Sequence, residues 1–222
     1  QTSENAVNYA CKLAAAQNAQ VIIIHAFMIP VMFSDIPMPG NIITDAEAGA
    51  EDEMNKLVAR MTAAHPGQAI EGRVIYGNLV EALEDYADEK NSPWLVVVGN
   101  SRAEGTKWPD SSLLDTLRQL AYPVLAIPPA AAFNPVKNIC FAFDNKHKAD
   151  GMALQQVSSY SNQLNAALHV LNIQTDENGD GPQEINAEAA RQLSAASPQY
   201  HFVYGASDID KGIQDFVAGN DI

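Results

Sequence analysis

The sequence contains few cysteines and no long apolar segment. Only two of its 222 residues are cysteines, Cys11 and Cys140, which is too few for a disulfide framework. Two isolated thiols favour a reducing cytoplasm over secretion. No apolar run approaches the roughly 20 residues that a helix needs to cross a bilayer. We therefore expect a cytoplasmic protein that does not bind a membrane.

Positive charge is also scarce. The chain has 13 lysines and arginines against 27 aspartates and glutamates, for a formal net charge of −14. Binding to nucleic acids and to anionic membrane surfaces depends largely on lysine and arginine. A chain this acidic is expected to repel both. Its five histidines and two cysteines show no metal-ligand spacing, so the sequence offers no metal site.

Short apolar runs alternate regularly with amphipathic segments. Hydrophobic residues make up 47% of the chain, which is enough to build real cores. The expected strands span 21–27, 70–76, 94–98 and 123–127, and the expected helices span 3–17, about 45–64, 79–89 and about 110–120. This alternation predicts an α/β fold, with a parallel sheet covered by helices on both faces.

The same pattern starts again after a segment rich in alanine and proline. The second set of strands is expected over 139–143, 168–173 and 202–204, and its helices over 148–165, about 183–196 and 209–218. Short stretches also repeat: Asn165-Ala166-Ala167-Leu168 matches Asn18-Ala19-Gln20-Val21, and Val203-Tyr204-Gly205 matches Ile75-Tyr76-Gly77. We therefore expect two tandem domains, 1–129 and 137–222, joined by a linker at 130–136.

The two halves differ at their ends. The second half opens with a strand that ends in Asp144, and the first half has no counterpart of this strand. The first half closes with a strand–loop–helix–strand unit over 94–129, which the second half lacks. We expect the natural polypeptide to supply both, as a first strand of domain 1 and a last unit of domain 2.

The segment 94–129 carries the most specific signal. An apolar strand ends at Gly99, a polar loop follows, Pro109-Asp110-Ser111 begins a leucine-bearing helix, and Pro123-Val124-Leu125-Ala126-Ile127-Pro128 forms the last strand. This layout resembles the C-terminal half of a universal stress protein domain, and the repeat extends the resemblance over nearly the whole chain. It implies two Rossmann-like domains in tandem, forming a pseudo-dimer or a homodimer through last strands such as 123–127.

The resemblance also implies a ligand and its site. In this family a carboxylate that ends the first strand faces an adenine, backbone groups near the end of the second strand line the base, and a glycine loop wraps the phosphates. In domain 2, Asp144 matches the carboxylate that faces the adenine, and Ile173 matches the backbone groups that line the base. Asp144 could equally cap the following turn or helix. The implied phosphate loop of domain 1 contains Gly99, Asn100, Arg102, Ser111 and Ser112. The implied ligand is ATP with magnesium.

The loop of domain 1 departs from the family pattern G-x2-G-x9-G-[ST]. Arg102 stands at the second glycine, and Ser112, or Asp110 in a shorter alignment, stands at the third. Glycine permits positive φ and a close approach of the backbone to phosphate. Asp110 would repel a phosphate about 4 Å away by on the order of 4 kcal/mol at an effective dielectric of about 20. We expect ATP to bind in at most one domain, with domain 1 binding weakly or not at all.

No motif supplies catalytic machinery. His25 ends a strand, but Asn172 stands at the matching place in the second half, and no nucleophile accompanies it in a recognisable motif. We therefore expect no catalytic residue, and a stress-response regulator rather than an enzyme. Two alternatives stay open: an interaction scaffold without nucleotide, and a slow ATP hydrolase, which rests on fold analogy alone.

Overall fold

The computed structural model describes residues 2–27, 42–87, 92–99, 118–143, 151–175 and 185–220, together with Ile222. The chain divides into two compact units, Gln1–Phe133 (unit 1) and Asn134–Ile222 (unit 2). All strand pairs in the described part of both units are parallel, as the alternation of strands and helices predicts.

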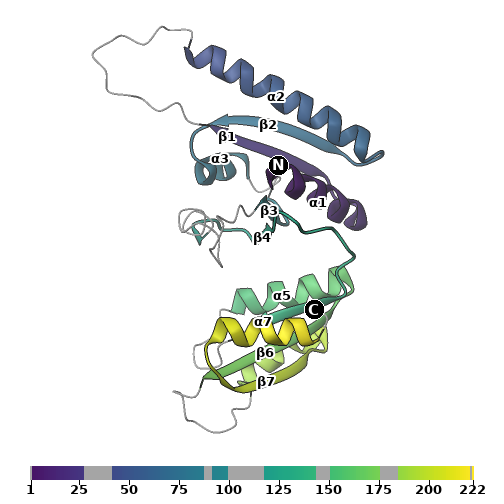
Figure 1. Cartoon of the computed structure of the whole chain (residues 1–222), viewed down its shortest axis with the longest axis vertical. Coiled ribbons are helices and arrows are strands. Elements are labelled where there is room, and N and C mark those ends of the chain that lie inside the picture. The colour runs from purple at the N-terminus through teal and green to yellow at the C-terminus, as the bar shows by residue number, and fades with distance from the viewer. Residues whose placement is uncertain are drawn as a thin grey trace, which may run out of the picture. The chain divides into compact units, whose positions relative to one another are not determined.

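Unit 1 contains two separate pairs of strands with helices packed against them (Figure 1). Its elements are α1 (Thr2–Gln17), β1 (Val21–Phe27), α2 (Ile42–Ala64), β2 (Ile70–Tyr76), α3 (Leu79–Tyr86), β3 (Val96–Gly99) and β4 (Val124–Ile127). β1 pairs with β2 and β3 pairs with β4, and no ladder joins β1 to β3 in the described part of this unit. The helix expected over 110–120 lies almost entirely outside the described residues.

Unit 2 contains one three-stranded sheet. Its elements are β5 (Asn138–Ala142), α5 (Gly151–Leu164), β6 (Ala167–Thr175), α6 (Ala187–Leu193), the short 3-10 helix η2 (Ser194–Ala196), β7 (Gln199–Ala206) and α7 (Ile209–Gly219). The strand order is β5-β6-β7, so the first strand of the unit pairs with one edge of β6 and the last with the other. The ladder between β6 and β7 shifts register at Gln174 and Thr175.

Several elements begin or end away from their expected bounds. β3 begins two residues late, where the N–H of Val96 donates to the carbonyl of Pro123 at 2.9 Å. α3 ends at Tyr86 instead of residue 89, and it begins as expected at Leu79 because the Asn78 side chain accepts from two N–H groups of the first turn. β7 is longer than expected because Gln199, Tyr200 and His201 also pair with β6.

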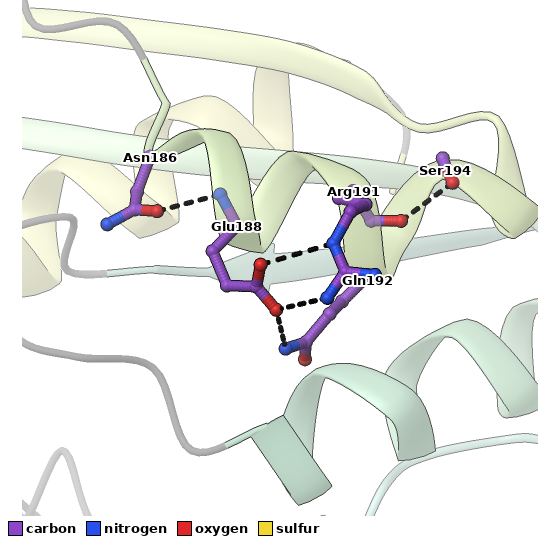
Figure 2. A network of polar contacts seen from close by, with 5 residues as sticks. All are labelled: Asn186, Glu188, Arg191, Gln192 and Ser194. Carbon is purple, nitrogen blue, oxygen red and sulfur yellow. Dashed lines mark hydrogen bonds and ion pairs between the residues drawn. The ribbon is translucent and has the colours of Figure 1, made fainter.

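The helix expected over 183–196 begins later, at Ala187, and its polar side chains form a network of contacts (Figure 2). Asn186 Oδ1 accepts from the N–H of Glu188 at 2.9 Å, so α6 begins at Ala187. The Glu188 carboxylate then accepts from Arg191 Nη2 and Gln192 Nε2, both at 2.7 Å. Ser194 Oγ donates to the carbonyl of Arg191 at 2.7 Å, at the point where the α-helix tightens into η2.

The backbone itself repeats between the units. Asn18 and Asn165 end their helices at positive φ, 52° and 51°, and the following residue donates to the preceding turn at 2.9 Å in each case. Asparagine tolerates this left-handed conformation better than most residues. The ladders also agree, since Phe27 pairs with Tyr76 as Gln174 pairs with Tyr204. The two halves of the sequence therefore form the same local structure.

Each unit has its own hydrophobic core. The core of unit 1 contains Cys11, Ala14, Val21, Ile23, Met54 and Met61. The core of unit 2 contains Phe143, Leu154, Leu168, Val170, Ala189 and Leu193. Both cysteines are free, and burial raises the pKa of each thiol, which keeps the thiols protonated at neutral pH. None of the described helices combines the length and the apolar character of a bilayer-spanning segment.

Candidate functional site

The carboxyl edge of the sheet in unit 2 is the place where the sequence predicts a nucleotide base. In open parallel sheets, ligands bind outside the carboxyl ends of the strands. β5 ends at Ala142, which pairs with Leu171 in the middle of β6. β6 continues to Thr175, so its last residues extend beyond the end of β5.

Asn172 fixes the end of β5 onto β6. Its side chain is only 5% exposed, and its Nδ2 donates to the carbonyl of Phe143 at 2.9 Å. The N–H of Phe143 donates to the carbonyl of Leu171, also at 2.9 Å. Both backbone groups of Phe143 are thus held by β6, immediately before Asp144. We did not predict this role for Asn172 from the sequence, although an amide within a buried apolar strand was the available signal.

Ile173 lies at this edge, with its side chain packed against α7. A Cβ added to Gly212 of α7 would lie 2.9 Å from Ile173 Cδ1 and 3.0 Å from Cγ2. Backbone groups alternate in direction along a strand, so the N–H and C=O of Ile173 point to the same side as those of Leu171, toward β5. β5 ends at Ala142, so no strand among the described residues pairs with these backbone groups of Ile173.

Gly99 is the last residue of β3, one residue beyond the expected end of this strand, and it pairs with Ile127 of β4. It belongs to unit 1, whereas Ile173 belongs to unit 2, so these two residues serve different candidate sites. The other predicted site residues lie outside the described residues: Asn100, Arg102, Ser111, Ser112 and Asp144.

His25 and Asn172 occupy equivalent positions in the two units but have different surroundings. His25 is exposed, and its ring lies parallel to that of Phe27, with 6.5 Å between the ring centroids. Asn172 is buried and hydrogen-bonded, as described above. Among the described residues, no group of three histidine, cysteine or acidic side chains is arranged to hold a metal ion.

Two histidines form an unpredicted pair on the face of the unit 2 sheet that α7 covers. His169 Nδ1 and His201 Nε2 lie 3.1 Å apart, and the His201 ring lies 4.8 Å from that of Phe216 on α7, centroid to centroid. One ring must donate to the other, so at least one acceptor nitrogen must be unprotonated. Burial, and then the charge of His169, lower the pKa of His201.

Unit 2 should therefore lose stability in mild acid. A histidine whose pKa is lower in the folded than in the unfolded state contributes its full stability above its ordinary pKa of about 6.5, and loses it as the pH falls below that value. We expect the urea midpoint of unit 2 to fall between about pH 7 and pH 5.5, and the His201→Gln variant to show a flatter profile. Parallel profiles for the two proteins would contradict this role of the pair.

Comparisons with known proteins agree with this fold. The model of the Universal stress protein family matches residues 1–127. A universal stress protein from Archaeoglobus fulgidus is similar over 100% of this chain and 80% of its own, with a TM-score of 0.67 and 16% identity. A protein of the universal stress protein family from Burkholderia pseudomallei is 27% identical, over 58% of this chain and 88% of its own, with a TM-score of 0.45.

A universal stress protein whose crystal structure contains cAMP is 29% identical, over 58% of this chain and 89% of its own, with a TM-score of 0.41. No curated protein sequence matches the chain. The Archaeoglobus structure extends the similarity in fold across both units. Because the family model matches more than half of the residues, this chain belongs to the universal stress protein family.

Proposed function

We propose that this protein is a stress-response regulator that binds an adenine nucleotide, ATP with magnesium, in unit 2. The observation that carries the proposal is the buried hydrogen bond from Asn172 to the carbonyl of Phe143. It holds the residue before Asp144 near the backbone edge of Ile173, which has no strand partner among the described residues. A buried amide is costly unless it is hydrogen-bonded, so this position favours a role in holding the edge in place.

Each residue has a separate task in this proposal. The Asp144 carboxylate accepts a hydrogen bond from the amino group of adenine, and the backbone of Ile173 contacts the base. Asn172 does not touch the ligand and acts as a positioning residue. Magnesium usually binds through substrate phosphates and a few protein groups, so it would arrive with the triphosphate of ATP. None of these roles requires that ATP be hydrolysed. We therefore propose that the protein binds ATP without hydrolysing it efficiently.

Unit 1 contributes little nucleotide binding in this proposal. Gly99 ends β3 where a phosphate loop would begin, but Arg102 stands at the second glycine of the family pattern, and Ser112 or Asp110 stands at the third. Because the third glycine would still be missing, the Arg102→Gly variant alone should leave the number of bound nucleotides unchanged.

Calorimetric titration with ATP and magnesium tests the proposal. We expect one class of site in the natural protein, and an affinity at least about tenfold lower in Asp144→Ala, because a hydrogen bond to a charged group contributes about 1.5–3 kcal/mol. Asp210→Ala, an exposed aspartate in the same unit, serves as the matched control and should bind like the natural protein. Absence of heat in the natural protein would favour the interaction scaffold, and equal affinity in Asp144→Ala would place the site elsewhere.

We also propose that the domains associate through β4, as a pseudo-dimer within one chain or as a homodimer. β4 is an edge strand in the described part of unit 1, and Val124 is half-buried there. Val124→Arg should lower the mass of a homodimer, or raise the radius of gyration of a pseudo-dimer at constant mass. Light scattering with small-angle X-ray scattering separates these outcomes, and Ala15→Arg on the exposed face of α1 is the control. No change in either quantity would contradict association through β4.

A further inference from the structure

The outer edge of β7 has no strand partner in the described part of unit 2. β7 ends the strand order β5-β6-β7, so it pairs with β6 on one side only (Figure 1). The equivalent edge is also unpaired in the described part of unit 1. There β2 bonds only to β1, although the later strands β3 and β4 are present and pair with each other. The open edge is thus a property of this position in both units.

Strand register decides which residues of β7 present their backbone to this edge. The N–H of Phe143 donates to the carbonyl of Leu171, so the backbone groups of Leu171 point toward β5. Those of its neighbours on β6 point toward β7, because the direction alternates along a strand. Each neighbour bonds to the two residues that flank its opposite residue on β7, and the opposite residue itself faces away. Tyr200, Phe202 and Tyr204 are these opposite residues, so they present N–H and C=O groups to the outer edge.

β7 also lacks the charges that usually protect an edge strand. Natural proteins commonly place lysine or other charged residues on such strands, which discourages pairing with another chain. β2 follows this rule, since it carries Glu71 and Arg73, which form an ion pair. No aspartate, glutamate, lysine or arginine occurs over 198–207, although the whole chain has a formal net charge of −14. Like-charge repulsion within β7 therefore does not oppose the pairing of two copies.

The side chains of β7 form a self-complementary pattern. Tyr200, Phe202 and Tyr204 share one face, because successive side chains of a strand alternate between faces. Tyr200 is 38% exposed and Tyr204 is 52% exposed. When a second β7 runs antiparallel with the two Phe202 residues opposite each other, Tyr200 of each strand lies opposite Tyr204 of the other. All three residues then exchange their outward N–H and C=O bonds, and aromatic side chains meet across the strands, which stabilises such pairs.

We propose that unit 2 binds a second copy of this chain through β7, as an antiparallel pair of strands related by a two-fold axis at Phe202. The symmetry follows from the register, because the contact between Tyr200 and Tyr204 occurs twice. Main-chain hydrogen bonds supply affinity, and the aromatic side chains fix the register. The interface is small, so the dimer forms reversibly and depends on concentration. It uses neither β4 nor the residues of the nucleotide site proposed for unit 2.

The test uses the whole chain, both natural and with Val124→Arg, the change chosen above to block association through β4. Sedimentation velocity over a range of concentrations measures the mass, and amide hydrogen exchange with mass spectrometry locates the contact. We expect a monomer–dimer equilibrium in the Val124→Arg protein. In both proteins, protection of Gln199–Ala206 should increase with concentration, because the outward N–H groups gain partners. A Val124→Arg monomer at every concentration, or a dimer that leaves exchange in β7 unchanged, would overturn the proposal.

Two charge variants test the register. Tyr200→Glu with Tyr204→Glu places like charges opposite each other twice, so the dimer dissociation constant should rise at least about tenfold. Tyr200→Lys with Tyr204→Glu places opposite charges there instead, and most of the affinity should return. Tyr76→Glu with Met152→Glu changes two exposed residues outside β7 and should dimerise like the natural chain. Circular dichroism checks that each variant folds. Equal loss of affinity in the two folded β7 variants would contradict the antiparallel register.

Discussion

Replacing Leu193 with alanine is expected to lower the free energy of unfolding of unit 2 by about 2–5 kcal/mol. Leu193 ends α6 with 0% of its side chain exposed. It packs in one cluster with Leu154, Leu168 and Val170, which come from α5 and β6. Truncation removes apolar contacts and leaves a cavity that backbone elements on several sides cannot easily close.

The matched control for Leu193→Ala is Met152→Ala on α5, where the side chain is 66% exposed. That change should alter stability by no more than about 0.5 kcal/mol. Urea unfolding followed by far-UV circular dichroism measures both variants. Both tryptophans, Trp94 and Trp108, belong to unit 1, so their fluorescence follows that unit separately. Equal midpoints for the two variants would contradict the assignment of Leu193 to the core.

Replacing Gly72 with valine should destabilise unit 1. A Cβ at this position of β2 would lie 2.6 Å from Met54 Cγ and 2.8 Å from Val58 Cγ2, both on α2. Met54 is itself buried, so its side chain has little room to move. β2 and α2 would have to separate, and overpacking of this kind typically costs about 1–3 kcal/mol. Tryptophan fluorescence during urea unfolding should show the loss.

Gly49→Ala, in the helix that packs against β2, should have the opposite effect on the stability of unit 1. Gly49 lies in α2, and a Cβ added there would meet no atom within 4 Å. Alanine favours a helix interior over glycine by about 0.5–1 kcal/mol, so this variant should be slightly more stable. If Gly72→Val unfolded at the same urea concentration as Gly49→Ala, the close packing of β2 against α2 would be wrong.

The existence and order of the strands could be predicted from short segments rich in apolar and β-branched residues, whereas several strand ends could not. The expected bounds of β1 and β2 are confirmed; the polar Gln20 precedes β1, and Gly77 follows β2. The tandem repeat is confirmed by Asn18 and Asn165, which share a left-handed conformation that the matching residues in the sequence had already suggested. The pattern of apolar residues is sufficient to predict these features, because each of them depends on residues within a single strand or helix end.

Contacts between elements could not be predicted in the same way. The His169–His201 pair and the bond from Asn172 to Phe143 join residues 32 and 29 positions apart, and both depend on strand register. The sequence also predicted parallel strands without showing that the described strands of unit 1 form two separate pairs. Of the candidate site residues, Gly99 is the last residue of β3 and Ile173 lies two residues before the end of β6, and their roles in binding stay predictions.

The nucleotide content of the protein purified from its native host tests the central claim most directly. The protein would be denatured, and the released small molecules identified and quantified against chain concentration by mass spectrometry. Our account predicts a single adenine nucleotide per chain, lost when Asp144 is replaced by alanine. A protein that carries no nucleotide and gains none from ATP with magnesium would contradict it, and would favour a scaffold that acts through protein partners.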